Sequence, residues 1–137
     1  MDAASYPAMP TPPMSPKVLI VDDDPLSRRL MQVHLGRAGF TVIEATNGQE
    51  GIKAAFCELP RVIIMDVIMS DMDGLTVVRE LKKVPATKNI PIVVITASVQ
   101  VHDAYRRECE MFGAAEFFTK PIAPAQLITQ IKRLAGS

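Results

Sequence analysis

The sequence lacks an excess of charge of either sign. Lys and Arg together number 15, as do Asp and Glu, so the formal net charge is zero. A protein that binds a nucleic acid duplex is expected to carry surplus basic charge or a basic stripe, and neither is visible here. We therefore expect no direct contact with nucleic acid.

Residues that bind soft metals or form disulfides are also few. The two cysteines, Cys57 and Cys109, lie far apart and form no Cys-x-x-Cys pair. No His/Cys set has zinc spacing, and no calcium-loop pattern occurs. We expect both cysteines to be small buried apolar residues in a reducing compartment, rather than a disulfide or a metal site.

Long apolar runs are missing as well. None approaches the roughly 18 residues that a membrane-spanning helix needs. The first residues lack the charged and apolar regions of a secretory signal. These absences predict a cytoplasmic protein with no membrane partner.

Proline is concentrated at the start of the chain. Five of the 11 prolines fall within residues 1–16. Proline fixes φ and removes a hydrogen-bond donor, so this segment is unsuited to a central strand or a helix. We predict a disordered tail over 1–16 and one domain over 17–137, where a composition that is 48% hydrophobic supplies a core.

From residue 17 onward, apolar runs typical of buried strands alternate with helical patterns. Strands are expected at 17–21, 41–45, 62–66, 92–96 and 116–119. Helices are expected after Asp24-Pro25, Asn47 and Asp73-Gly74, near 100–112, and from Pro124. This order predicts an α/β fold with a doubly wound five-stranded parallel sheet, in the flavodoxin-like order 2-1-3-4-5 with helices on both faces.

Polar side chains follow four of the expected strands. Asp22 and Asp23 follow the first, Asp66 ends the third, Thr96 ends the fourth, and Lys120 follows the fifth. Because ligands bind at the carboxyl ends of the strands in such sheets, we expect these groups to converge. Three carboxylates repel one another unless a cation neutralises them, and Mg²⁺ is the hard cation that prefers such oxygens.

This set of side chains indicates phosphoryl transfer. A carboxylate can attack phosphorus and form an aspartyl phosphate, and the reaction mostly needs positioning and charge neutralisation. Asp66 is the best nucleophile, because it stands alone at the end of a central strand. Asp22 and Asp23 are better placed to hold the metal, while Lys120 and Thr96 can contact the phosphoryl oxygens.

Four fragments carry a resemblance to a known family. They are Val-Asp-Asp-Asp at 21–24, Met-Asp-Val-Ile-Met at 65–69 with Met-Asp-Gly at 72–74, Ile-Thr-Ala at 95–97, and Phe-Thr-Lys-Pro at 118–121. Each is weak alone, but all four stand in order at strand ends. Residues 17–134 therefore resemble the receiver domain of two-component response regulators, here of the stand-alone type.

The resemblance implies a role for each matching residue. Asp66 would accept a phosphoryl group from a phosphohistidine on a histidine kinase or a histidine phosphotransfer protein. Mg²⁺ would be held by Asp22, Asp23, Asp66 and the backbone carbonyl of Ile68.

The same resemblance implies a conformational response. Thr96 would move toward the phosphoryl group, Lys120 would pair with it, and the Lys120–Pro121 bond would be cis. Phe117 matches an aromatic that changes rotamer with the hydroxyl residue. The face of the fourth helix, fifth strand and fifth helix would then bind an output protein or support a phosphorelay.

The sequence departs from the family pattern at two places. Ser70 stands where the family usually has proline, so the loop after Asp66 is expected to be more mobile. Ile68 and Ser98 stand at positions that tune the lifetime of the acyl phosphate. An apolar Ile68 does little to orient water, so we expect slow autodephosphorylation. As a phosphoacceptor signalling domain, the chain is not expected to be an enzyme.

Several residues also have simpler interpretations. Asp24 is expected to act only as a helix cap, and Asp71 and Asp73 as turn and helix-start residues. His34 and His102 are expected to be surface or half-buried helix residues. The polar group Tyr105, Arg106 and Arg107 fits an output surface and a solvated helix face equally well.

Two alternative functions remain open. A degenerate receiver would bind partners without phosphorylation. A small phosphatase of the haloacid-dehalogenase type would form its aspartyl phosphate on the first strand, where Asp22-Asp23-Asp24 supplies an Asp-x-Asp pattern. For the leading hypothesis we expect a monomer or weak dimer.

Overall fold

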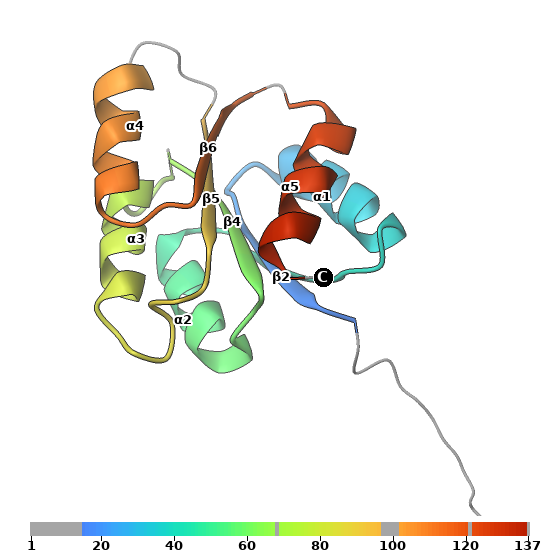
Figure 1. The fold of residues 1–137 in the computed structure, drawn as a ribbon, viewed down its shortest axis with the longest axis horizontal. Helices are drawn as coiled ribbons and strands as arrows, with labels where there is room; N and C mark the ends of the chain where they lie inside the picture. The colour runs from blue at the N-terminus through green and yellow to red at the C-terminus, as the bar shows by residue number, and fades with distance from the viewer. Residues whose placement is uncertain (1–14, 68, 97–101, 121, 137) are drawn as a thin grey trace, which may run out of the picture.

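The computed structural model describes residues 15–67, 69–96, 102–120 and 122–136, and for 102–105 only the backbone. Strands and helices alternate along these residues (Figure 1). The elements are β2 (Lys17–Val21), α1 (Pro25–Arg37), β3 (Thr41–Ala45), α2 (Gly48–Glu58), β4 (Val62–Asp66), α3 (Gly74–Lys82), β5 (Ile92–Thr96), α4 (His102–Met111), β6 (Glu116–Thr119) and α5 (Pro124–Leu134).

The five strands form one parallel sheet in the order β3-β2-β4-β5-β6. Counted from the first strand of the sheet, this is the predicted order 2-1-3-4-5. The two central neighbours, β2 and β4, pair from Val18 opposite Val62 to Val21 opposite Met65. The chain reverses its winding between these strands, so the carboxyl ends of β2 and β4 border the crevice of the fold.

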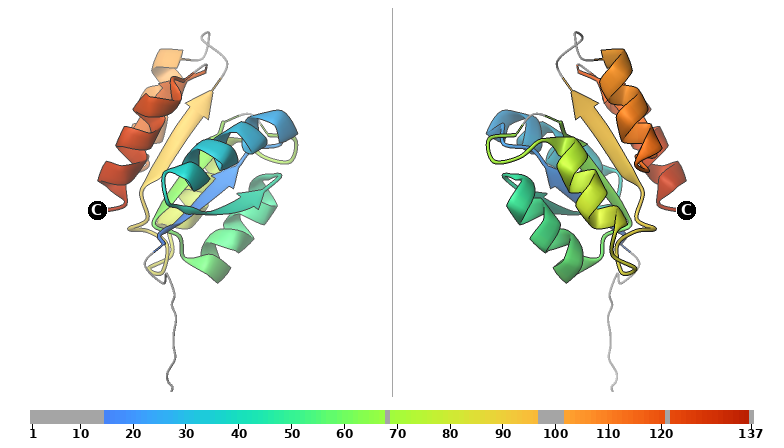
Figure 2. Two further views of the ribbon diagram at one scale, coloured as in Figure 1. Left: turned by 90° about the vertical axis from the view of Figure 1, so that its right-hand side faces the viewer. Right: turned by 90° about the vertical axis from the view of Figure 1, so that its left-hand side faces the viewer.

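Helices cover both faces of the sheet. Figure 2 shows α1 and α5 on one face and α2, α3 and α4 on the other. Side chains alternate between the faces along a strand, so Val18 and Ile20 pack toward α1 and α5, whereas Leu19 and Val21 join the opposite cluster. Strands buried on both faces account for the continuous apolar runs in the sequence.

Short polar side chains begin three of the helices, as predicted. Asp24 accepts a hydrogen bond from the Leu26 amide (3.1 Å), and Asn47 accepts one from the Glu50 amide (2.8 Å). Asp73 caps α3 through the Thr76 amide at 2.9 Å. These caps satisfy amides that have no partner within the first helical turn.

One expectation about buried residues is corrected by the structure. The helix indicated by the spacing of Leu26, Leu30 and Val33 is present, and α1 packs on the sheet through Met31 and Leu35, with the other three side chains exposed. Cys109 is buried as expected, but Cys57 is exposed. Helical spacing identifies a stripe, but it does not say whether that stripe faces the sheet.

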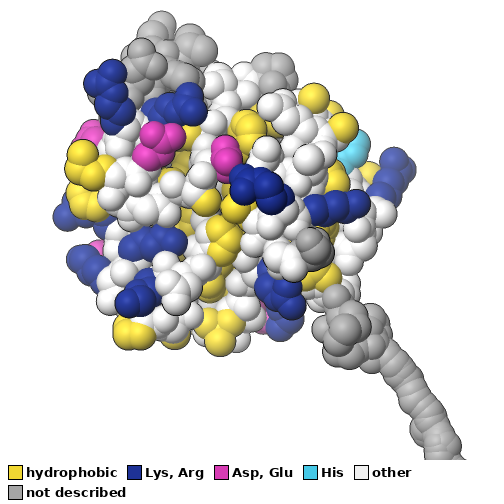
Figure 3. All heavy atoms as spheres, in the orientation of Figure 1, with side chains coloured by type: hydrophobic (Ala, Val, Ile, Leu, Met, Phe, Trp, Pro, Cys, Tyr) yellow, Lys and Arg dark blue, Asp and Glu magenta, His cyan; other side chains and the backbone are white. Residues whose placement is uncertain are grey.

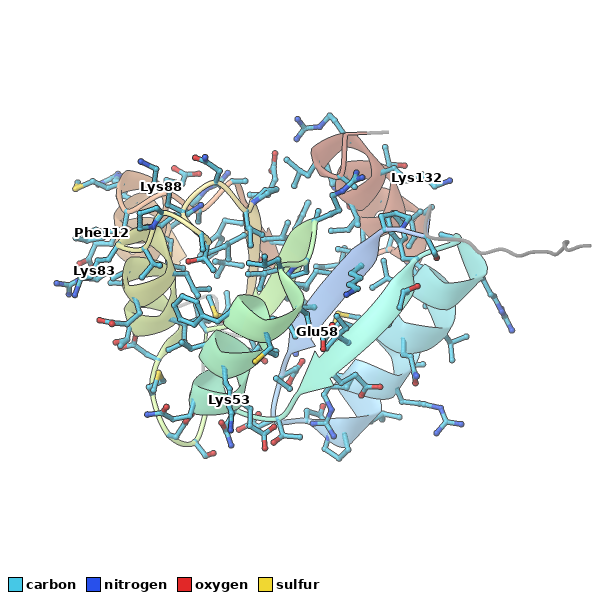
Figure 4. All side chains as sticks on the ribbon, turned by 90° about the horizontal axis from the view of Figure 1, so that it is seen from below. Lys53, Glu58, Lys83, Lys88, Phe112 and Lys132 are labelled. Atoms are coloured by element: carbon cyan, nitrogen blue, oxygen red, sulfur yellow. The ribbon has the colours of Figure 1, made fainter. Side chains whose placement is uncertain are left out.

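Long side chains make contacts near the C-terminal ends of α3 and α4. The guanidinium of Arg79 lies 5.0 Å from the centre of the Phe112 ring. Lys82 donates to the carbonyls of Lys88 and Ile90 at 2.9 Å each, and burial lowers the pKa of Lys82. Figure 4 shows Phe112 and Lys88 on this side, with Lys132 on α5 well away from them.

The beginning of the described chain is attached to the domain. The Ser15 hydroxyl donates to the Gly39 carbonyl (2.9 Å), and the Thr41 amide donates to the Pro16 carbonyl (2.9 Å). The rest of the predicted tail, residues 1–14, lies outside the described residues. Within the described ranges, no helix is long and apolar enough to cross a membrane.

Candidate functional site

The ends of four strands bring the predicted site residues to one edge of the sheet. Asp66 is the last residue of β4 and pairs with Ile95 on β5, while Thr96 pairs with Thr119 on β6. The Lys120 amide donates to the Thr96 carbonyl at 2.7 Å, which continues the β5–β6 ladder by one residue. The backbone therefore delivers the Lys120 side chain to the edge that holds the carboxylates.

Lys120 joins two carboxylates from different strands. Its Nζ lies 3.0 Å from Asp66 Oδ2 and 3.2 Å from Asp22 Oδ2. The Asp22 side chain is 1% exposed and that of Asp66 12%. Burial opposes the charge on Lys120, but the hydrogen bonds and charges of Asp66 and Asp22 outweigh it and raise the lysine pKa. The ammonium therefore stays charged at neutral pH.

Asp22 is fixed by contacts on its other side. Its Oδ1 accepts the Asp24 amide at 2.9 Å, and its backbone carbonyl accepts a hydrogen bond from Arg28 at 2.7 Å. Arg28 also pairs with Glu44 at 3.3 Å. The Asp22 carboxylate is therefore bound on both sides, by the Asp24 amide and by the Lys120 ammonium, which fixes its orientation.

The oxygen-rich edge fits a hard divalent cation. Two carboxylates share one ammonium, which leaves net negative charge, and Asp23 adds a third carboxylate that is exposed. In the part of the chain that the structure describes, no group of three or more His, Cys, Asp or Glu side chains is gathered around a metal position. Mg²⁺ needs no such cage, since it usually takes one or two carboxylates with waters and phosphate oxygens.

The residues predicted to respond to phosphorylation are buried. Thr96 is fully buried at the end of β5. Phe117 on β6 is 6% exposed and belongs to the core cluster on the α2–α4 face, where the Arg106 guanidinium lies 6.0 Å from its ring centre. The predicted Ile68 carbonyl ligand and the predicted cis bond at Pro121 fall outside the described residues.

Sequence reasoning missed the contacts of the segment that follows Asp66. Asp71, expected to be a turn residue, accepts hydrogen bonds from the Gly48 and Gln49 amides at the start of α2, both at 2.9 Å. No local sequence pattern predicts this contact, because Gly48 and Gln49 precede Asp71 by 23 and 22 residues. The sequence also predicts a helix start at Gly74, but not the close backbone approach there: a Cβ on Gly74 would lie 2.9 Å from Val67 Cα, so only glycine fits.

A pocket of about 530 Å³ opens beside this edge between α1 and α5. Lys120 and Ile95 form its inner wall, and His34, half-buried as predicted, lies on its α1 side. Leu26 and Leu30, which are 66% and 53% exposed, extend the apolar surface along α1. An open apolar surface thus adjoins the carboxylates on one side of the sheet.

The fold and the edge together define a small flavodoxin-like domain with a lysine-bridged acidic site, and comparison with known proteins agrees. The sequence profile of the response regulator receiver domain matches residues 18–132. Response regulator PleD of Caulobacter vibrioides is 38% identical over 121 residues, which are 88% of this chain and 26% of PleD. The chain therefore belongs to the response regulator receiver domain family.

Solved structures show the same architecture. Chemotaxis protein CheY4 of Vibrio cholerae is 30% identical, with a TM-score of 0.81 over 88% of this chain and 98% of that one. The receiver domain of sensor histidine kinase PA1611 from Pseudomonas aeruginosa PAO1, solved with a magnesium ion in its active site cleft, is 24% identical with a TM-score of 0.80, covering 90% and 99%.

Family membership fixes the general function. The chain is a signalling domain of the two-component type, whose general function is to accept a phosphoryl group. It spans between about a quarter and a half of the length of the curated relatives it matches.

Proposed function

We propose that Asp66 accepts a phosphoryl group from a phosphohistidine in a magnesium-dependent reaction. The observation that carries this proposal is the pair of contacts from the Lys120 ammonium to Asp66 and Asp22. A charged ammonium beside the acceptor can offset the negative charge of the phosphoryl oxygens. Thr96, at the end of the neighbouring strand, is the hydroxyl donor in this proposal.

The transfer balances as a displacement at phosphorus. An Asp66 carboxylate oxygen forms the new P–O bond, the N–P bond of the phosphohistidine breaks, and the imidazole leaves with the electron pair and takes up a proton. Asp66 is partly buried and already contacts Lys120, so it is held in place before the donor arrives. Lys120 keeps its proton and contributes charge only.

Asp22 and Asp23 are the residues that would hold Mg²⁺, with Asp66 and the Ile68 carbonyl completing the set. The bound cation supplies neutralisation of the phosphoryl oxygens and of the carboxylates. The oxygen-only donor set and the residual negative charge around Lys120 support this assignment. The magnesium seen in the PA1611 receiver is consistent with it.

The α1–α5 side is the proposed approach for the phosphodonor. Leu26, Leu30 and Val33 form an exposed apolar stripe on α1, and the adjacent pocket reaches Lys120. An apolar helix surface beside the acceptor suits a histidine kinase or a histidine phosphotransfer protein that docks a helix there. Positive side chains are spread across the face seen in Figure 3 rather than gathered in one stripe, which suits a protein partner better than nucleic acid.

Phosphorylation would then be passed on through α4, β6 and α5. In this proposal Thr96 and Phe117 shift together, and the altered surface binds an output protein or passes the group onward, in a cytoplasmic protein that is a monomer or weak dimer. Autodephosphorylation is slow and no substrate is turned over. The phosphatase alternative is disfavoured because Asp24, its second acid, already caps α1.

The test is intact-mass measurement after incubation with Mg²⁺ and phosphoramidate, which carries the same N–P bond. We expect one added phosphoryl group on the wild type and none on Asp66→Ala. Glu58→Gln is the matched control, because Glu58 is an exposed carboxylate that pairs with Lys17 elsewhere on the molecule. Normal labelling of Asp66→Ala would overturn the assignment, and no labelling of any form would favour a phosphorylation-independent scaffold.

A further inference from the structure

Asp71 connects the segment after the phosphoacceptor to a different helix. Its Oδ1 accepts the Gly48 amide and its Oδ2 accepts the Gln49 amide, each at 2.9 Å. Hydrogen bonds from Gln49 and Gly48 hold the pKa of the Asp71 carboxyl below its usual value. Both oxygens of an exposed side chain are thus used to hold two segments of the chain together.

The same junction is packed as well as hydrogen-bonded. A Cβ on Gly48 would collide with the Met72 side chain and would lie 2.8 Å from its sulfur. Gly48 is buried, so the absence of a side chain lets Met72 lie directly on the first turn of α2. Asp71 and Met72 therefore both hold the segment against α2.

The two ends of this segment are fixed by main-chain bonds. The Val67 amide donates to the Ile95 carbonyl at 3.0 Å, and the Gly74 amide donates to the Val67 carbonyl at 2.8 Å. Ser70 lies between these ends and is exposed. Serine does not restrict φ as proline does, so the middle of the segment depends on contacts from outside it.

We propose that Asp71 is a positioning residue for the phosphorylation site: by binding the first amides of α2, it holds the segment after Asp66 in the geometry that metal binding and phosphoryl transfer require. This inference rests on the proposed function. In this role Asp71 acts through the backbone that continues from Asp66, and it does not itself bind the metal or the phosphoryl group. The hydrogen bonds of Asp71 thereby restrain a segment in which Ser70 supplies no proline ring to fix the backbone.

The test compares Asp71→Ala, Asp71→Asn and the matched control Glu50→Ala. Glu50 is an exposed carboxylate in the same region, but it accepts hydrogen bonds from the amide and hydroxyl of Thr46, just before α2, and so does not connect α2 to the segment after Asp66. Three quantities are measured on each: the Mg²⁺ dissociation constant by calorimetry, the rate of labelling by phosphoramidate, and deuterium uptake over residues 67–74.

We expect Asp71→Ala to weaken Mg²⁺ binding by about three- to tenfold, less than the loss of a group that touches a metal ligand. Labelling should slow by a similar factor at subsaturating Mg²⁺, and uptake over 67–74 should rise. Asp71→Asn keeps one acceptor oxygen without the charge, so it should lie between the wild type and Asp71→Ala. Glu50→Ala should match the wild type in all three measurements.

Two results would overturn the inference. One is wild-type Mg²⁺ affinity and deuterium uptake in Asp71→Ala. The other is equal weakening in Asp71→Ala, Asp71→Asn and Glu50→Ala, which would mean that only negative charge matters. If the wild type itself accepts no phosphoryl group, the proposed function fails, whereas unchanged uptake over 67–74 in Asp71→Ala contradicts the anchor separately.

Discussion

The two faces of the sheet support the same edge in different ways. On the α2–α4 face, the core is closed over Val77, Val78 and Leu81, and Asp71 anchors the segment after β4. On the α1–α5 face, a pocket of about 530 Å³ reaches Lys120 beneath an exposed apolar stripe. One face is closed and holds the segment after β4 against α2, while the other presents an open apolar pocket beside Lys120.

This difference separates stability from recognition. Substitutions on the closed face should lower the free energy of unfolding, because tightly packed side chains cannot relax around a void. Substitutions on the open face should leave folding nearly unchanged and alter the encounter with the phosphodonor. Four changes, taken from the largest effect to the smallest, can break or sharpen this contrast.

Leu81→Ala tests whether the closed face is as well packed as it looks. Leu81 is fully buried on α3, so the change removes apolar contacts and leaves a cavity. We expect a loss of about 2–5 kcal/mol in the free energy of unfolding, measured by urea denaturation. A loss below about 1 kcal/mol would show that this face can collapse around the void.

Lys120→Met tests the charge balance at the edge between the two faces. The variant removes the cation that both Asp22 and Asp66 contact. Without Mg²⁺ we expect a loss of about 1–3 kcal/mol in the free energy of unfolding, because two carboxylates then lie close together without that ammonium. Added Mg²⁺ should stabilise the variant more than the wild type, and equal stabilisation of both would contradict this account.

The pH dependence of stability tests whether Cys109 is buried on the closed face. Burial raises the pKa of the Cys109 thiol to about 11 from 9.0, with help from the charges of Asp73, Glu108 and Glu110. Between pH 9 and 11 the unfolded chain loses this proton while the folded chain keeps it, so stability falls as pH rises. The fall should be smaller in Cys109→Ala, measured by urea denaturation across this range.

A labelling experiment gives the companion result. Iodoacetamide at pH 8 should modify exposed Cys57 quickly and buried Cys109 only on unfolding. Rapid modification of both thiols in the folded protein would mean that the α3–α4 side opens readily.

Leu30→Ser tests the open face. Leu30 is 53% exposed, so the free energy of unfolding should change by less than about 0.5 kcal/mol. Transfer from a phosphohistidine protein should slow, whereas labelling by phosphoramidate should match the wild type. If both donors were affected equally, the stripe would act on the site itself rather than on docking.

The fold was predictable because its signals are local. Continuous apolar runs identified β4 and β5 to the residue, and caps such as Asp24 and Asn47 marked helix starts. The rule that parallel strands need crossover helices then left few strand orders. Strand ends also predicted that Asp22, Asp66 and Lys120 would meet, since such ends share one edge of the sheet.

What could not be predicted depends on distant partners. Asp71 contacts Gly48 and Gln49 at the start of α2, which precede it in the chain by 23 and 22 residues. No periodicity in the sequence encodes a contact between residues so far apart. Helix α1 has two apolar stripes, one with Leu26 and Leu30 and one with Met31 and Leu35. Which of them faces the sheet depends on the rotation of the helix about its axis, and in the structure it is the second. The roles of the site residues in catalysis and switching stay predictions.

The lysine that joins the acidic edge comes from far along the chain. Lys120 follows Asp22 by 98 residues and Asp66 by 54. On the ribosome, both carboxylates are synthesised well before the ammonium that joins them, and domains generally fold as units. A nascent chain that ends before β6 therefore lacks the ammonium that both carboxylates contact in the folded domain, so the charge balance of this edge is completed only near the end of synthesis.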